Sequence, residues 1–489
     1  MNSHEHAESY TPITSWEREE PRVESRSVDV KHSSKLKGAR LVAFSALAAP
    51  LFAIQVPLSA YVPAILTQQY GLSLATVGLV FLLAKSWGVL TDPLVGNLSD
   101  RTHSSFGRRR SWILAGGVAF GLSTLGLFFP PSHIAPLYLG TVLFLFYLAW
   151  SMTQIPYFAW SGEVAVEYQD RTRAVTYQTV SGALGMLLVL IIPTIADHLR
   201  PGDGALKLHA MGAIVLATLL PGLLLTLRAF PESSAPPRTS LLTSSRPSPL
   251  HAFRLILTNP LLMRILAADF SMLLGQMTRG SLFVFFVTSY MRLPAWSSGL
   301  FLVQFIFGIA AGPLWMFISR HLGKHRTVIA GEITQVLINL GLLYVVPGSL
   351  PLLLGLTIAQ GLAQSSGNLM LQAMVADVAD EHRLRTGEDR KALFFSVFSI
   401  SQKASMAAAV GIALPFVAWL GFDPRAASNS LQALHGLQLT FALAPALLHA
   451  VAALLIRGFA LDADAYELVR RKLAERDLAP NRASCPVSH

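Results

Sequence analysis

Three ionisable residues lie within long apolar segments of the sequence, where charged side chains are rare. Asp92 and Lys85 share the segment that contains Leu79, and Lys403 follows the residues FSISQ in a later segment. An isolated charge near the centre of a lipid bilayer costs at least about 2.5–3.5 kcal/mol, so such residues usually serve a function. Burial and nearby cations both shift the proton affinity of a carboxylate. We therefore interpret Asp92 as a candidate group for binding and releasing a cation, with Lys85 and Lys403 as its candidate partners.

The spacing around Asp92 places several residues on one helix face. Lys85, Gly88 and Asp92 are separated by three and four residues, which brings side chains to the same side of an α-helix. At about 1.5 Å per residue, Lys85 is expected about 10 Å from Asp92 along the axis. We expect this face to point toward the interior of a helical bundle.

Composition indicates the kind of element that positions these residues. Hydrophobic residues make up 52% of the chain and charged residues 13%, whereas soluble domains have about 25% charged residues. Apolar runs of the roughly 20 residues needed to cross a bilayer recur along the chain. Backbone groups in lipid must pair internally, so spans of this composition are predicted to be helices rather than barrel strands. The expected fold class is an all-α membrane protein, with spans at 41–66, 74–98, 111–130, 134–160, 174–196, 207–229, 262–290, 296–319, 327–347, 350–376, 391–420 and 432–457.

The distribution of basic residues predicts orientation and domain organisation. The formal net charge is +10, and because Lys and Arg concentrate in alternate loops, this charge indicates membrane orientation rather than a nucleic-acid partner. Both termini are expected in the cytosol. A Pro- and Ser-rich stretch divides the chain, which predicts a cytoplasmic tail (1–40), a six-helix bundle (41–229), a linker (230–261), a second six-helix bundle (262–457) and a C-terminal helix with tail (458–489). The single cysteine, Cys485, carries no disulfide or metal pattern.

Charged clusters in the predicted cytoplasmic loops are candidates for gates. Salt bridges there could form in one conformation and part in another, and exposed pairs of about 0–1 kcal/mol each suit a reversible contact. The alternative is that these charges only set the orientation of the helices. The candidate gating residues are Asp100, Arg101, Arg108, Glu163, Arg173, Asp377 and Arg390.

Several of these motifs resemble one transporter family. The stretch DPLVGNLSDRTHSSFGRRRSWIL resembles the second-to-third span signature of the glycoside-pentoside-hexuronide:cation symporters, a branch of the major facilitator superfamily that includes the melibiose permeases. Residues 156–177, 377–403 and 461–477 resemble further segments of that family. The resemblance implies two pseudo-symmetric six-helix bundles in the plasma (inner) membrane. They are expected to move a small-molecule solute together with a coupling H⁺ or Na⁺ by alternating access, without a cofactor.

The resemblance also implies roles for the charged residues within the spans. Asp92 matches one of two span-two carboxylates that bind the coupling cation, while the other falls on Gly88. A metal ion needs several oxygen ligands and a proton needs one base, so this departure favours H⁺ over Na⁺; uncoupled transport is a further alternative. Lys403 matches a family lysine in span eleven, beside span two, which predicts an Asp92–Lys403 ion pair. Alternatively, Asp92 braces the next loop through Arg101 or Arg108, and Lys403 reaches the membrane interface.

The sugar-binding charges of galactoside-transporting relatives are missing, since they fall on Phe52, Gln154 and Ser181. Polar and aromatic residues nearby remain candidates for binding a neutral glycoside by hydrogen bonding and stacking. For each aromatic residue the alternative is ordinary helix packing or a position in an interfacial belt. These candidate substrate residues are Gln55, Tyr61, Gln154, Tyr157, Trp160 and Gln178.

Span seven carries two further charges, Asp269 and Arg279. Ten residues separate them by about 15 Å along a straight helix, so they are not expected to pair. A guanidinium suits bidentate binding of a carboxylate, which makes Arg279 a candidate for binding a hexuronide or another organic anion. The alternative is that Arg279 pairs with a carboxylate from a neighbouring helix.

Enzymatic functions find no support in the sequence. It contains no G-x-x-x-x-G-K-[ST] nucleotide loop, no H-E-x-x-H or paired C-x-x-C, and no G-x-S-x-G nucleophile elbow. We expect a monomeric, cation-coupled carrier of a sugar or glycoside. The alternatives are a carrier of a non-sugar solute, such as an organic anion, a lysolipid, an amino acid or a pigment, and a non-transporting receptor or assembly factor.

Overall fold

A computed structural model describes residues 38–165, 168–200, 202–232, 259–426 and 428–483. Within these ranges the regular secondary structure consists of helices, which confirms the predicted all-α class. The predicted tail, most of the predicted linker and the last residues of the chain lie outside the described residues.

The first predicted span is a series of short helices rather than one. It consists of α1 (Gly38–Ser45), α2 (Ala48–Ala53), a π-helical turn η1 (Pro57–Tyr61) and α3 (Val62–Gln68). Proline has no N–H to donate and disturbs the helix interior, and Pro50, Pro57 and Pro63 fall within this stretch. Long helices follow: α4 (Leu74–Arg101), α5 (Arg108–Phe128), α6 (Pro136–Val164), α7 (Tyr168–Leu199) and α8 (Gly204–Ala229).

The second half of the chain has a similar series. It begins with α10 (Pro260–Phe285), which continues into a π-helical turn η3 (Phe286–Tyr290), and a short 3₁₀ turn η4 (Pro294–Trp296) follows. The remaining elements are α11 (Ser297–Leu322), α12 (Lys324–Gly341) with the 3₁₀ turn η5 (Leu342–Tyr344), α13 (Leu350–Thr386), α14 (Lys391–Trp419), α15 (Leu431–Ile456) and a polar C-terminal helix α16 (Ala463–Ala483).

Eleven helical segments among the described residues are long and apolar enough to cross a membrane. Helix α13, which covers the predicted span 350–376, is not among them. Its middle carries Gln360, Gln364 and Asn368, which lower its hydropathy. The predicted number of twelve spans therefore stays a prediction.

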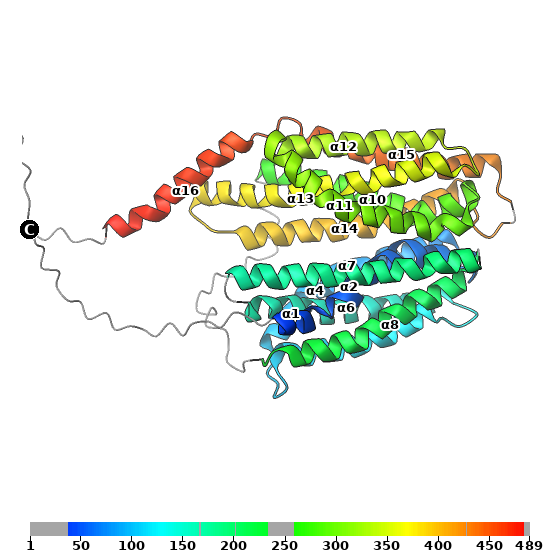
Figure 1. Ribbon diagram of the computed structural model, residues 1–489, viewed down its shortest axis with the longest axis horizontal. Coiled ribbons are helices and arrows are strands. Elements are labelled where there is room, and N and C mark those ends of the chain that lie inside the picture. The colour runs from blue at the N-terminus through cyan, green and yellow to red at the C-terminus, as the bar shows by residue number, and fades with distance from the viewer. Residues whose placement is uncertain (1–37, 166–167, 201, 233–258, 427, 484–489) are drawn as a thin grey trace, which may run out of the picture. The chain divides into compact units, whose positions relative to one another are not determined.

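Among the described residues, helices of the two halves pack against one another extensively. Helix α4 packs against α14, α7 against α11, and α10 against η1 and α3. Figure 1 shows α1–α8 gathered on one side and α10–α15 on the other, with the long helices running in similar directions. The predicted contact between spans two and eleven is confirmed by the α4–α14 pair. Apolar residues elsewhere face outward, for example Leu90 at 70% and Trp419 at 78% exposure, as lipid-facing helices require.

Candidate functional site

The predicted ion pair between the two halves is present. The ammonium of Lys403, on α14, contacts the carboxylate oxygen Oδ2 of Asp92, on α4. The hydroxyl of Ser151, on α6, donates to the other oxygen, Oδ1. Asp92 is thus held by one cation and one hydroxyl, each from a different helix, and its side chain is 18% exposed.

The structure contains neither of the alternative arrangements for these two residues. Arg108 pairs with Glu163 rather than with Asp92, Arg101 is exposed, and the Lys403 ammonium reaches Asp92 instead of the interface. The role of the pair in coupling stays a prediction.

Lys85 lies on the same contact between α4 and α14 but has a different partner. Its Nζ donates to the backbone carbonyl of Met406 at 3.3 Å. The contact between α4 and α14 therefore carries two ammonium groups, of which Lys403 pairs with Asp92 and Lys85 with a backbone carbonyl.

A cavity of about 330 Å³ lies mainly between helices of the second half. Its volume is near the lower end of the range for small-molecule sites. Phenylalanines and small residues form part of its wall, and the first span and α7 contribute Val56, Ser59, Ala60 and Leu190. Its polar lining consists of Gln276, Arg279, Gln304, Gln360, Gln364, Ser365 and Asn368.

Arg279 is the charged residue of this lining and is buried, with 3% exposure. Its Nη1 donates to Asn339 Oδ1 at 3.0 Å and to Gln360 Oε1 at 2.6 Å. The guanidinium lies 5.5 Å from the centre of the Phe441 ring. Its Nε and Nη2 are buried and have no hydrogen-bond partner. Arg279 thus lines the cavity, while two of its donors lie buried without a partner.

The other predicted substrate residues lie outside this cavity lining in the described part of the chain. Tyr157 donates to the Phe44 carbonyl at 3.1 Å and stacks on the Phe44 ring, whose centre lies 5.2 Å away. Trp160 packs edge-on against the same ring. Gln178 is buried, Gln55 and Gln154 are half-buried, and Tyr61 packs 5.5 Å from the cavity residue Phe301. Their roles in substrate binding stay predictions.

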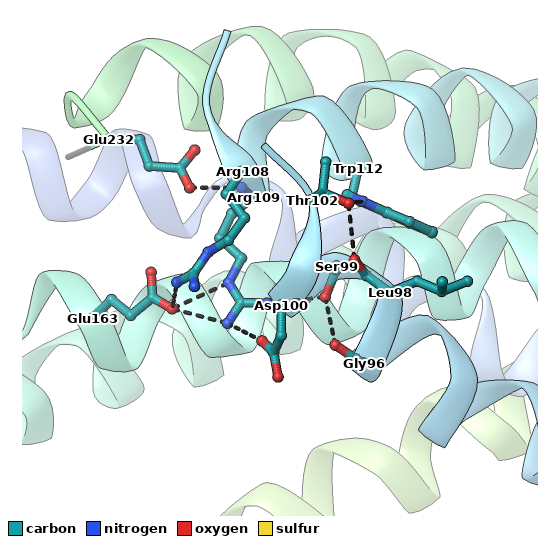
Figure 2. A network of polar contacts seen from close by, with 10 residues as sticks. All are labelled: Gly96, Leu98, Ser99, Asp100, Thr102, Arg108, Arg109, Trp112, Glu163 and Glu232. Atoms are coloured by element: carbon teal, nitrogen blue, oxygen red, sulfur yellow. Dashed lines mark hydrogen bonds and ion pairs between the residues drawn. The ribbon is translucent and has the colours of Figure 1, made fainter. Parts of the chain in front are cut away.

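Three predicted gating residues meet in one network at the end of the bundle that carries the Arg-rich loops, here called the basic end (Figure 2). Arg108 Nη2 lies 2.7 Å from Glu163 Oε1, and Arg109 Nη2 lies 2.9 Å from the same oxygen and 2.6 Å from Asp100 Oδ1. Glu232, which the sequence analysis did not single out, accepts from the backbone N–H groups of Arg109 at 2.6 Å and Arg110 at 3.0 Å.

Three further gating candidates form local pairs at the basic end, whereas Arg101 is exposed and its gating role stays a prediction. Asp377, on α13, pairs with Lys324, whose Nζ lies 2.6 Å from Asp377 Oδ2. Arg173 pairs with Asp170 at 2.8 Å, and Arg390 pairs with Glu388. Among the described residues, these ion pairs join elements of the same half of the chain.

Helix α16 adds a hydroxyl to the network of the second half. Tyr466 donates to Asp380 Oδ2 at 3.2 Å. Burial, together with the negative charges of Asp377 and Asp380, raises the pKa of Tyr466 to about 12. The phenol therefore stays protonated at neutral pH and acts as a hydrogen-bond donor that docks α16 on the basic end.

The opposite end of the bundle has contacts between the halves that the sequence analysis missed. Asp197, on α7, is fully buried and pairs with Lys207. Its Oδ2 also accepts from the hydroxyl of Ser297 at 3.1 Å and from the backbone N–H of Ser298 at 2.9 Å, at the start of α11. Gln68 adds a 3.4 Å hydrogen bond to Thr288. The sequence feature that could have indicated this network is Asp197, an acidic residue at the end of an apolar span.

Comparisons with known proteins agree with this architecture. A family model described as MFS/sugar transport protein matches residues 43–463. Escherichia coli YagG, named as a glycoside/cation symporter, is 23% identical over 437 residues, which cover 86% of this chain and 93% of YagG. The lactose permease of Lactobacillus delbrueckii subsp. bulgaricus is 24% identical over 377 residues, or 74% of this chain and 59% of the permease.

A more distant relative and a solved structure extend the comparison. The sodium-dependent lysophosphatidylcholine symporter 1 of Xenopus tropicalis is 22% identical over 414 residues, which cover 76% of this chain and 77% of that protein. The crystal structure of nucleoside transporter NupG superposes with a TM-score of 0.62 at 11% identity, covering 86% of this chain and all of NupG, and this likeness supports the fold alone.

The family match spans most of the chain, and the helices, the ion pair between the halves and the cavity all suit a carrier. The chain therefore belongs to the MFS/sugar transport protein family, as a multi-pass membrane transporter that moves a small solute with a coupling cation and is not an enzyme.

Proposed function

We propose that this transporter moves a sugar or glycoside together with a proton, and that Asp92 carries the proton. The observation behind this proposal is the Asp92–Lys403 pair at the contact between α4 and α14. Protonating Asp92 removes its negative charge and with it the attraction to Lys403. The contact between the two halves then weakens, which links proton binding to their relative movement.

The ligands around Asp92 favour H⁺ over Na⁺. One ammonium and one hydroxyl approach the carboxylate. A hard metal cation prefers several oxygen ligands, and the neighbouring ammonium opposes a second positive charge. Gly88, one turn earlier on α4, supplies no side-chain oxygen. A proton needs only the carboxylate itself.

The cavity beside Arg279 supports a polyhydroxylated substrate with a negative group. The amides of Gln276, Gln304 and Gln364 can donate to and accept from hydroxyls, and Phe283 and Phe301 can pack against a sugar ring. The two unused donors of Arg279 suit the carboxylate of a hexuronide. The lactose permease among the relatives supports a sugar as substrate.

Alternating access follows from the difference between the two ends of the bundle. Contacts between the halves at the opposite end include the buried Asp197, whereas the described ion pairs at the basic end stay within one half. This arrangement suits a carrier that is closed at the opposite end and opens toward the basic end. Since basic loops favour the cytosol, we assign the basic end and both termini to the cytosol and expect a monomer to suffice.

Uptake by reconstituted vesicles tests the proposal. The panel contains neutral glycosides, uronides and other organic anions, each with an imposed pH or Na⁺ gradient. We expect a proton gradient to concentrate a sugar or uronide in the wild type, and Asp92→Asn to permit only exchange down the solute gradient. The matched control is Asp423→Asn, in an exposed loop. Accumulation by Asp92→Asn at the wild-type level would contradict the role of Asp92.

A second candidate is a proton-coupled carrier of a non-sugar organic anion. Arg279 has unused donors for an anion, while Phe283, Phe301, Phe305 and Ile309 make much of the wall apolar. The lysophosphatidylcholine symporter among the relatives is named for an amphiphilic, phosphate-bearing solute. Uptake restricted to non-sugar anions in the same panel would favour this candidate over a sugar.

A further inference from the structure

A group of titratable side chains lies inside the second half, away from Asp92 and outside the cavity lining. We call it the acid–imidazole cluster, and it comprises Asp269 on α10, Glu332 on α12 and His449 on α15. Their exposures are 0%, 1% and 0%. Glu332 Oε2 lies 2.6 Å from His449 Nδ1. The amide of Gln402, on α14, donates to Asp269 Oδ1 at 3.3 Å.

Two polar atoms of the cluster have no hydrogen-bond partner, namely Asp269 Oδ2 and His449 Nε2. Apolar residues surround this region, including Met272 and Phe398. A deprotonated carboxylate in such a place loses its hydration, which costs several kcal/mol unless a cation compensates. In the described part of the chain, no lysine or arginine forms an ion pair with any of the three residues.

The helices around the cluster present few other charged groups to it. The two arginines of α10 have other partners: Arg264 donates to carbonyl oxygens at the end of α15, and Arg279 donates to Asn339 and Gln360. From α13 the cluster meets Gly367, where an added Cβ would lie 2.6 Å from Glu332 Oε1. From α14 it meets Gln402, whose neighbour Lys403 is engaged by Asp92. Among the described residues, His449 is the group paired with a cluster carboxylate that can supply positive charge.

The charges of the three groups determine how many protons make the cluster neutral. Two ionised carboxylates and a neutral imidazole carry a charge of −2, so two added protons make the cluster neutral. One of them belongs to the short Glu332–His449 hydrogen bond, on either partner. The other belongs to Asp269. We propose that Asp269 and the Glu332–His449 pair form a second proton-binding site, inside the second half of the chain and separate from Asp92.

The position of Gln402 connects this site to the first one. Gln402 donates to Asp269, and the next residue, Lys403, pairs with Asp92. A movement of α14 relative to α10 and α4 changes both contacts at once. The two sites therefore respond to the same conformational change, whereas protons can occupy them independently.

Infrared difference spectroscopy of the full chain in lipid, recorded across a pH step, tests the proposal. The method detects the C=O stretch of a protonated carboxylic acid apart from the bands of carboxylates. Starting from Asp92→Asn, which removes the signal of the first site, we expect a carboxylic-acid band that disappears when Asp269→Asn is added. The control is Asp423→Asn, because the backbone and side chain of Arg425 hold the pKa of Asp423 below its ordinary value and keep it ionised.

A second variant, His449→Gln, tests the Glu332–His449 pair independently of Asp269. In His449→Gln, Glu332 loses the partner that shares its proton, so we expect an additional carboxylic-acid band that Glu332→Gln removes. Either spectral change supports the site. If neither Asp269→Asn nor His449→Gln alters the carboxylic-acid bands, the cluster binds no exchangeable proton and the proposal is overturned. Because Asp92 is absent from the reference protein, this outcome is independent of the proposed role of Asp92.

Discussion

Asp92 and Arg279 differ in how their charges are compensated, and this difference separates their roles. Asp92 contacts a full cation, Lys403, so its charge is balanced while the solute is absent. Arg279 is buried among neutral amides and an aromatic ring, with two donors unused. A buried charge without a counter-ion is costly. This contrast supports the proposals of an anionic ligand at Arg279 and a proton at Asp92.

Replacing Arg279 should affect uronide binding and the stability of the protein differently. In Arg279→Gln, the KM for a uronide is expected to rise about 10- to 100-fold, because hydrogen bonds to charged groups contribute about 1.5–3 kcal/mol and each 1.4 kcal/mol is tenfold. Neutral glycosides should change little. The melting temperature should change little, because the loss of the hydrogen bonds to Asn339 and Gln360 offsets the removal of a buried charge.

Arg264→Gln is the matched control on the same helix. Arg264 donates to the carbonyl oxygens of Leu455 and Arg457 at 2.9 and 2.7 Å, so its loss should lower the melting temperature without changing KM. Equal uronide KM values for wild type and Arg279→Gln would show that Arg279 does not bind the uronide.

A carboxylate introduced at Gly88 tests whether the coupling cation is H⁺ or Na⁺. A Cβ at Gly88 would meet Tyr147 atoms at 3.9 and 4.0 Å, which is ordinary contact. In Gly88→Asp, a second carboxylate one turn from Asp92 adds oxygen ligands, so we expect uptake to become stimulated by Na⁺. Uptake with and without Na⁺ is the measurement, and Gly88→Asn is the control without added charge. Na⁺ stimulation already present in the wild type would contradict proton coupling.

Two helices on the basic end begin in the same way, one in each half. Gly107 precedes α5 with φ 114° and ψ 147°, and Gly323 precedes α12 with φ 77° and ψ 161°. This backbone region is almost restricted to glycine. After each glycine, a basic side chain pairs with an acid of another helix, Arg108 with Glu163 and Lys324 with Asp377. The two halves therefore share this structural element.

The two glycines should differ in their tolerance of alanine. Backbone strain at either position costs about 1–3 kcal/mol. At Gly107 an added Cβ would also collide with the carboxylate of Glu232, whereas nothing lies within 4 Å of one at Gly323. Thermal unfolding should therefore show a larger loss of stability for Gly107→Ala than for Gly323→Ala. Gly140→Ala, in the open helical position of α6, should be neutral or stabilising by up to about 1 kcal/mol. Equal losses at both glycines would argue against the Glu232 cap.

The helices and the ion pair were predictable to different degrees and for different reasons. Apolar length alone predicted α4 from residue 74, because burial in lipid dominates such segments. The interruption of the first span was missed, since it depends on three prolines in a segment that stays apolar throughout. Family resemblance predicted the Asp92–Lys403 pair. Ser151 and the amides around Arg279 could not be predicted, because their contacts depend on how distant helices cross.

At the scale of the whole molecule, the distribution of contacts between the halves defines its conformation. Two of these contacts lie at different levels, namely the Asp197 network at the opposite end and the Asp92–Lys403 pair within the bundle, whereas the described ion pairs at the basic end stay within one half. Transport requires the first to break as the basic end closes. Asp197 is the sharpest target, because one carboxylate holds Lys207, Ser297 and the N-terminus of α11 together.

Weakening this network should shift the carrier toward a state open at the opposite end. Asp197→Asn with Lys207→Met removes the ion pair without leaving a buried charge, and each 1.4 kcal/mol lost from the closed state changes the populations about tenfold. With Cys485→Ser as background and Gln304→Cys as a reporter in the cavity, a membrane-impermeant maleimide added from the opposite side should label the double variant about tenfold faster. Asp423→Asn removes an exposed charge at the same end and keeps the hydrogen bond from Arg425 to the Gly71 carbonyl, so it should leave the labelling rate unchanged. If the rate in Asp197→Asn with Lys207→Met also equals that of the parent, the Asp197 network braces the helices but does not control access, and closure at that end must come from apolar packing instead.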